Sequence, residues 1–269
     1  MIDAYAAGFV GDTEKGYDII LDKAEGSDKP CVNKGVITLS GYCGDYAMVA
    51  GLLASPNYSS ADANETLIKN AVNEGEVKCI NVTCTGSVRV GGVAGVQVTS
   101  NKTNSSQMTN ASNKGNITVD NVKASELHVG GICGYISGGL APNGELVNVG
   151  NISVSNITTT TAGAIYTGGI VGRSTLPVDG AKCYCSINTQ AHPNTGFVFG
   201  SARSATAVAK NCQIGGEIAS EYDEEEDEYL TEKISSSNFH KYIYGGGTTD
   251  WTGVENYDGC SALASKPAL

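Results

Sequence analysis

Apolar and polar residues alternate with a period of two at four places in the chain, each time directly after an Asn-x-Gly tripeptide. Such alternation is typical of a β-strand with one buried face, because successive side chains of a strand point to opposite sides. The four tripeptides begin at Asn33, Asn73, Asn113 and Asn148. The apolar columns that follow them are Ile37, Val77, Ile117 and Ile152, then Leu39, Cys79, Val119 and Val154, and the polar column between them is Thr38, Lys78, Thr118 and Ser153.

A second marker recurs with almost the same period. It is a pair of small residues, usually two glycines, followed by Leu, Val or Ile, and it stands at 50–52, 91–93, 130–132 and 168–170. Two markers at a period near 40 residues indicate a repeat architecture, in which equivalent residues of successive repeats stack into ladders. We expect the marker glycines to permit a tight bend after a strand. These structural glycines are Gly51, Gly91, Gly92, Gly130, Gly131, Gly168 and Gly169.

Three further columns describe the path between the markers. One holds Gly or Asn, the residues that tolerate a left-handed backbone, and therefore predicts a corner. Its members are Gly41, Asn81, Asn121 and Asn156. The strand before each glycine pair has an inward column of Ala47, Val88, Leu127 and Ile165 and an outward column of Met48, Arg89, His128 and Tyr166.

These patterns predict an all-β fold, a parallel β-solenoid of about six to seven rungs. Each repeat supplies about three short strands, and polar excursions of variable length should emerge along one edge, at 55–66, 99–107 and 137–144. Whether a repeat makes one coil or two stays open. Helix signals are poor, with a short helical turn expected at 61–72 and another near the N-terminus.

Both ends of the chain fit the period poorly, and solenoids cover their open edges. We expect residues 1–30 to form an N-terminal cap or irregular first rung and residues 31–218 to form the solenoid. Residues 219–269 should hold an acidic insertion and a terminal rung or cap, so that the whole chain is a single domain. The rung near 183–203 is degenerate.

The motif Gly-Gly-(Val or Ile)-x-Gly, at 91–95, 130–134 and 168–172, followed by a polar loop and an Asn-x-Gly strand, resembles the GLUG repeat of large secreted and surface proteins of bacteria. The resemblance covers about residues 31–218 and implies a right-handed β-helix-like solenoid in an adhesin-like protein. That motif is structural and carries no catalytic residue. The chain departs from it at Ala50, which replaces a glycine, and near 196.

Composition and charge exclude several classes of protein. The chain has 269 residues and a formal net charge of −11, so we expect no positively charged surface that would bind the phosphate backbone of a nucleic acid. No apolar run reaches the length of a transmembrane helix. The start lacks the segments of a signal peptide, and we expect the sequence to be an excerpt of a longer extracellular or cell-surface protein.

The outward column offers a weak binding site. Arg89, His128 and Tyr166 should be neighbours on successive rungs and would form a small sugar-binding strip of aromatic faces and hydrogen-bond donors. The alternative is a solvated face of unrelated side chains. The three histidines are too far apart for a local metal motif, so we expect no metal and no cofactor.

Other candidates for chemistry are poorer. Asp120 is the best general base, and Cys185 with His192 is a conceivable thiol dyad, although nothing orients the pair. The acidic run 221–228 lacks the pattern of a calcium loop, and we expect a solvated, mobile insertion. The nine cysteines are scattered, and we interpret most of them as small buried hydrophobic residues.

The leading functional hypothesis is a non-enzymatic surface module that binds glycan or a host surface protein through loops and exterior columns. The alternatives are a polysaccharide-active β-helix enzyme and a ligand-free structural spacer.

Overall fold

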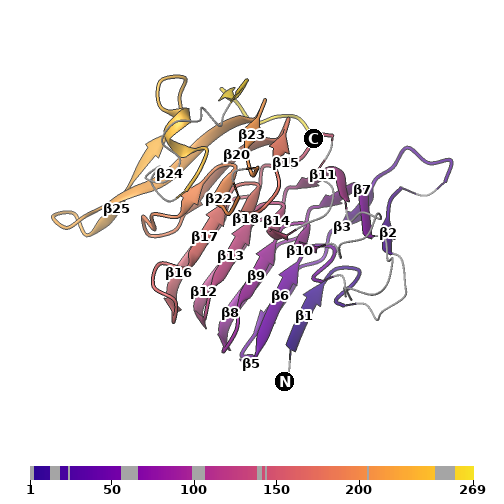
Figure 1. The fold of residues 1–269 in the computed structure, drawn as a ribbon, viewed down its shortest axis with the longest axis horizontal. Coiled ribbons are helices and arrows are strands. Elements are labelled where there is room, and N and C mark those ends of the chain that lie inside the picture. Colours follow the sequence, from indigo (N-terminus) through magenta and orange to yellow (C-terminus); the bar gives the residue numbers. More distant parts are fainter. Residues whose placement is uncertain are drawn as a thin grey trace.

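The computed structural model describes residues 3–12, 19–23, 25–55, 66–98, 107–137, 141–142, 144–204, 206–245 and 258–269. Almost every element is a β-strand, and parallel strands from successive repeats stack into a β-solenoid of about four turns (Figure 1). The predicted fold class is therefore confirmed, whereas the expected six to seven rungs are too many. The predicted polar excursions fall mostly outside the described residues.

Two sheets are formed by the strands on either side of the glycine-pair markers. The six-stranded sheet has the order β1 (Asp3–Ala7), β6 (Tyr46–Ala50), β9 (Val88–Gly91), β13 (Leu127–Gly130), β17 (Ile165–Gly168) and β21 (Thr195–Gly196). The four-stranded sheet has the order β10 (Ala94–Val98), β14 (Cys133–Ser137), β18 (Val171–Ser174) and β22 (Phe199–Ala202).

The strands on either side of the Asn-x-Gly markers form a fourteen-stranded sheet. Its main path is β2 (Ile19–Leu21), β7 (Thr66–Asn73), β11 (Gln107–Asn113), β15 (Val147–Asn148), β20 (Lys182–Asn188), β16 (Ile152–Thr159), β12 (Ile117–Ala124), β8 (Val77–Cys84) and β4 (Ile37–Ser40). Strands off this path are β3 (Cys31–Asn33), β5 (Cys43–Gly44), β24 (Gln213–Asp223), β25 (Glu228–Lys233) and β26 (Ser261–Ala262). The remaining elements are the pair β19 (Val178–Asp179) and β23 (Ala209–Lys210) and the 3-10 helix η1 (Phe239–Tyr242).

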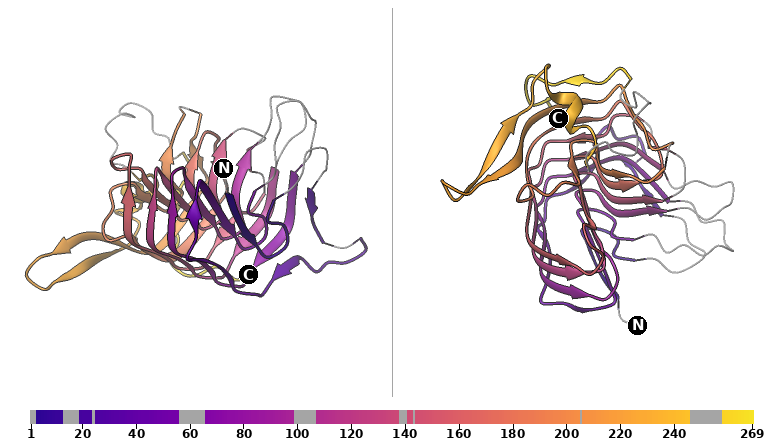
Figure 2. Two further views of the ribbon diagram at one scale, coloured as in Figure 1. Left: turned by 90° about the horizontal axis from the view of Figure 1, so that it is seen from below. Right: turned by 60° about the vertical axis from the view of Figure 1, so that its left-hand side comes forward.

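Each repeat makes one coil of four strands, as β7 to β10 pair one by one with β11 to β14 of the next repeat (Figure 2). The expectation of three strands missed the one that precedes each Asn-x-Gly marker. Asn70 and Asn110 interrupt β7 and β11 with positive φ angles of 47° and 50°, which breaks the alternation there. The helical turn expected at 61–72 is wrong for its described part, since Thr66–Asn73 is strand β7.

The stacking of the apolar columns is confirmed residue by residue. Ile37 pairs with Val77, Val77 with Ile117, and Ile117 with Ile152 in parallel register. The three later members of this ladder are at most 1% exposed. Cys79 lies in the second ladder between Leu39 and Val119, as expected of a small hydrophobic residue. The solenoid core is therefore a set of apolar ladders that run along the stack.

The predicted corners are confirmed by backbone geometry. Gly41, Asn81, Asn121 and Asn156 all have positive φ angles, between 50° and 68°. Three of the four strands simply continue through the corner, because an asparagine tolerates a left-handed conformation. The column of Gly and Asn thus marks a bend within β8, β12 and β16 rather than their ends.

The marker glycines are required by close packing between turns. A Cβ atom added at Gly92 would lie well under 3.0 Å from the carbonyl oxygen of Gly131, and one at Gly131 equally close to that of Gly169. A Cβ atom added at Gly51 would lie equally close to the carbonyl oxygen of Gly92. At Gly91, Gly130 and Gly168 a Cβ atom would strike the carbonyl three residues later. The glycines therefore permit both the bend and the contact with the next turn.

A buried ladder of asparagine side chains runs along the stack. The Nδ2 of Asn33 donates to Oδ1 of Asn73 at 2.8 Å, Asn73 donates to Asn113 at 2.8 Å, and Asn113 donates to Asn148 at 2.9 Å. Each Nδ2 also donates to the carbonyl oxygen of the glycine two residues later. The Asn-x-Gly marker is thus both a bend and a hydrogen-bonded column.

The ladder ends where the marker is lost. Cys183 pairs with Asn148, and Asn148 Nδ2 lies 3.9 Å from the Cys183 sulfur. With no Asn-x-Gly bend there, β20 runs straight and pairs with both β15 and β16. This agrees with the prediction that the rung near 183–203 is degenerate.

Strands occur close to both ends of the chain. Asp3–Ala7 pairs in register with β6, so the regular sheet begins inside the segment 1–30. The acidic run near 221–228 is the tip of an antiparallel hairpin of β24 and β25, which projects from the stack (Figure 1). No helix among the described residues has the length and hydropathy to cross a membrane.

Candidate functional site

The outward column of the six-stranded sheet is continuous over five strands. Tyr5 pairs with Met48, Met48 with Arg89, Arg89 with His128, and His128 with Tyr166. The sequence therefore predicted correctly that Arg89, His128 and Tyr166 are neighbours on successive rungs. It missed Tyr5 on β1, which is the first member of the column in chain order; we call this end of the column the near end.

This column is not a solvated exterior strip. The four-stranded sheet lies against it, and the ring of Tyr135 on β14 lies 5.0 Å from the ring of His128. His128 is only 1% exposed, and its ring also contacts Tyr166 at 5.4 Å. The expectation of an exterior column is wrong for His128.

Glycines after the bend explain the close approach of these two sheets. A Cβ atom at Gly134 would lie 2.9 Å from the backbone of Val90, and one at Gly172 would lie 2.7 Å from the nitrogen of Val129. At Gly134 and Gly172 the last glycine of the Gly-Gly-x-x-Gly motif therefore allows the second sheet to lie close to the first. The residues that follow these glycines, Tyr135 and Arg173, form the covering column.

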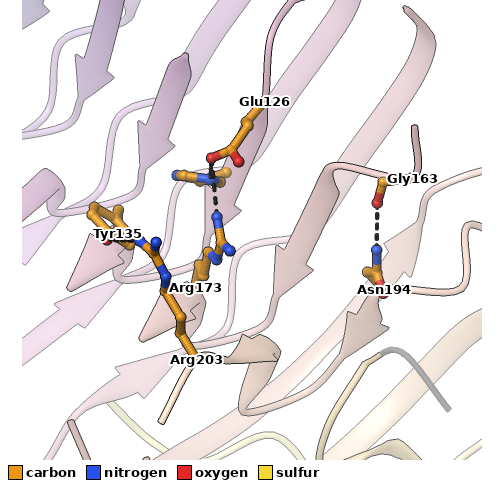
Figure 3. A network of polar contacts seen from close by, with 7 residues as sticks. Glu126, Tyr135, Gly163, Arg173, Asn194 and Arg203 are labelled. Carbon is orange, nitrogen blue, oxygen red and sulfur yellow. Dashed lines mark hydrogen bonds and ion pairs between the residues drawn. The ribbon is translucent and has the colours of Figure 1, made fainter. Parts of the chain in front are cut away.

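Charged groups lie close to the buried His128, and Figure 3 labels Glu126, Arg173 and Arg203. The Glu126 carboxylate accepts hydrogen bonds from Nε2 of His128 at 3.1 Å and from Nη1 of Arg173 at 3.0 Å. The Arg173 guanidinium lies over the ring of Tyr166 at 4.6 Å, and that of Arg89 lies over the ring of Tyr135 at 4.8 Å. Figure 3 also shows Arg203, which donates to the Tyr135 hydroxyl at 2.9 Å.

Burial and hydrogen bonding shift the titration of this network. Burial lowers the pKa of His128 to about 4, and the hydrogen bond with Glu126 opposes this only in part. The hydrogen bond from His128, reinforced by the charge of Arg173, lowers the pKa of Glu126 to about 2. At neutral pH the histidine is neutral, donates from Nε2 and leaves Nδ1 without a partner among the described residues.

We expect the stability of the protein to fall as the pH is lowered from about 6.5 towards 4. The unfolded chain protonates His128 near pH 6.5, whereas the folded protein keeps it neutral to about pH 4, a difference of about 3 kcal/mol at most. His192 acts in the same direction, and protonation of Glu126 removes stability in a lower window, from about pH 4.5 to 2. Urea unfolding at several pH values measures the effect.

The variant His128→Gln isolates the contribution of His128. It should be less stable at pH 7 but should have a much shallower pH dependence between 6.5 and 4 than the wild type. An equal slope in both proteins would show that His128 does not stay neutral in the folded state.

A pocket opens beside the near end of the outward column. It has a volume of about 330 Å³ and is lined by Asp3, Tyr5, Asp12, Tyr46, Met48, Ser55 and Arg89. Two carboxylates, two tyrosines and one arginine therefore face one concave space. Of these residues the sequence singled out only Arg89 as a binding candidate. Asp3, Tyr5 and Asp12 come from the segment that we expected to be a cap, Tyr46 and Met48 lie on β6, and Ser55 follows the glycine-pair marker.

The other candidates from the sequence do not form reactive sites. Asp120 accepts hydrogen bonds from Asn156 and Ser155, both at 2.8 Å, and these lower its pKa, which disfavours a general base. The Cys185 sulfur lies 3.5 Å from that of Cys183, and no contact joins it to His192 in the described structure. Nothing in the sequence orients a Cys185–His192 pair, and the described structure does not bring these two residues into contact.

The cysteines are free, and six of the nine are buried. This confirms for most of them the interpretation as small hydrophobic residues. Burial raises the pKa of Cys79 and Cys133 to about 12, so these thiols are protonated at neutral pH. Within the described residues, no three His, Cys, Asp or Glu side chains are grouped so as to hold a metal ion.

Comparison of the chain with known protein families, with curated proteins and with solved structures found no match. The likeness to the GLUG repeat therefore remains a prediction from the sequence motif.

Proposed function

We propose that the chain is a non-enzymatic recognition module of a bacterial surface protein and that it binds glycan. The observation that carries the proposal is the pocket of about 330 Å³ at the near end of the outward column. The resemblance of the repeats to the GLUG motif supports the surface setting. The solenoid serves as a rigid frame that holds the strands of this pocket in register.

The chemistry of the pocket suits a saccharide. Carboxylates such as Asp3 and Asp12 accept hydrogen bonds from sugar hydroxyls, and the Arg89 guanidinium donates them. Tyr46 is 37% exposed and offers an aromatic face with a polar tip, which suits the apolar face of a sugar ring. A small polar pocket favours glycan over a host protein, whose recognition requires a broad interface.

The variant Tyr46→Ala should weaken glycan binding at least about tenfold, because it removes the exposed aromatic face of the pocket. The ligand is first identified on a glycan array with the whole chain, and affinities are then measured by calorimetry. Tyr222→Ala, which removes a similarly exposed tyrosine from the distal hairpin, is the matched control and should bind as the wild type does.

Two results would overturn the proposal. One is an array on which no glycan binds, which would favour a spacer without a ligand. The other is the release of shorter products when the protein is incubated with polysaccharides, which would show an enzyme.

A further inference from the structure

All arginines of the chain gather in one place. The sequence contains three, Arg89, Arg173 and Arg203, and they come from three different turns of the solenoid. Arg89 and Arg203 contact the same tyrosine, Tyr135, one at its ring face and one at its hydroxyl. Arg173 covers Tyr166, whose ring contacts the same histidine as Tyr135 does. We call these three residues the arginine cluster.

The arginine cluster carries more positive charge than its own ion pairs neutralise, although Asp3 and Asp12 line the same pocket as Arg89. Glu126 is the one carboxylate that pairs with it among the described residues, through Arg173. Three guanidinium groups, which are always charged, and one carboxylate leave two positive charges. This excess stands out in a chain whose formal net charge is −11.

The guanidinium groups keep capacity for further hydrogen bonds. The Nε atoms of Arg89 and Arg173 are buried and have no hydrogen-bond partner within the described structure. Arg203 is exposed, Arg89 is half-buried, and the hydrogen bond from Arg203 to the Tyr135 hydroxyl uses only one of the five N–H donors of Arg203. A half-buried group of like charges is stabilised by an anion that accepts those hydrogen bonds.

We infer that the arginine cluster binds an anionic group, a carboxylate or a sulfate, carried by an acidic saccharide. The planar fork of arginine matches the two oxygens of such groups, which lysine does not do as well. Arg89 lines the pocket and belongs to the cluster, so a sugar in the pocket can place its charged substituent against the cluster. The saccharide part of this inference rests on the proposed function.

The test measures binding of the whole chain to polygalacturonate, dextran sulfate and uncharged dextran by calorimetry at low salt. We expect the two acidic polymers to bind and dextran to bind far more weakly. Arg203→Gln should weaken binding of an acidic polymer about tenfold or more, because it removes an exposed charge-assisted donor without emptying a core position. Lys123→Gln, which removes one exposed positive charge from β12, is the control and should stay within about twofold.

A second probe separates the anion site from saccharide binding. Potassium sulfate should raise the melting temperature of the wild type more than potassium chloride of equal ionic strength does. It should raise the melting temperature of Arg203→Gln by a smaller amount.

Equal loss of polymer binding in Arg203→Gln and Lys123→Gln overturns the inference, because it shows attraction by net charge alone. Neutral glycans that bind through Tyr46, without any arginine-dependent binding of sulfate or acidic polymer, overturn the inference and leave the proposed function standing. Arginine-dependent binding of sulfate with no binding of any saccharide overturns the proposed function and supports the anion site alone.

Discussion

Replacing Gly115 by alanine should destabilise the protein by about 3 kcal/mol. A Cβ atom at Gly115 would lie well under 3.0 Å from both the carbonyl oxygen and the carbonyl carbon of Gly75 on the preceding turn. Neither group belongs to a flexible side chain, so the two turns must move apart. Because the same contact recurs at Gly75 and Gly150, the strain is expected to spread along the stack. The free energy of unfolding in urea measures the loss.

The matched control is Gly35→Ala. Gly35 has the same place in the Asn-x-Gly marker, but no Asn-x-Gly turn precedes it, and the nearest atom to an added Cβ is Oδ1 of Asn33 at 3.5 Å. This is ordinary van der Waals contact, so we expect a change within about 0.5 kcal/mol. Equal effects of the two substitutions would show that the glycines serve the local bend alone and that the turns are not in contact.

The variant Asn113→Ala should cost at least about 3 kcal/mol. Asn113 is fully buried, and its amide bonds to Asn73, Asn148 and the carbonyl of Gly115. Alanine leaves the Asn148 oxygen and the Gly115 carbonyl without these donors, and it leaves Asn73 without its acceptor. Buried polar groups that lose their partners cost about 1 to 3 kcal/mol each. Urea unfolding monitored by circular dichroism checks the loss.

Asn116→Ala is the comparison for this effect. Asn116 is exposed three residues further on, and its side chain accepts one hydrogen bond, from the backbone of Asn151 at 3.0 Å. Water replaces that bond, so we expect a loss below about 1 kcal/mol. If Asn113→Ala proved as mild as Asn116→Ala, the asparagine column would not be a hydrogen-bonded ladder.

The periodic parts of the fold were predictable from the sequence because each ladder position is filled by similar residues in every turn. One buried column can be recognised because it holds only Ile or Val, at Ile37, Val77, Ile117 and Ile152. The column of Gly and Asn marks the corner. The extra strand before each marker was not predictable in this way, since a left-handed asparagine such as Asn70 shifts the alternation within it. The rung count was too high, since the stack has about four turns.

The candidate site was only partly predictable. Period-two alternation assigns His128 to the face that points away from the core, but it does not show that another sheet covers that face. The missing signal was the last glycine of the Gly-Gly-x-x-Gly motif, at Gly134 and Gly172, which brings Tyr135 and Arg173 over the column. The arginine cluster joins β9, β18 and the segment after β22, and no single repeat carries enough of it to reveal the site.

The most direct test of the account is a crystal structure of the whole chain that resolves side chains. We expect Ile37, Val77, Ile117 and Ile152 to lie one above another, with about 4.8 Å between successive strands, and the amides of Asn33, Asn73, Asn113 and Asn148 to form one hydrogen-bonded column. A structure in which these residues point into separate cores, or in which strands of neighbouring repeats run antiparallel, would contradict the solenoid and every inference drawn from its register.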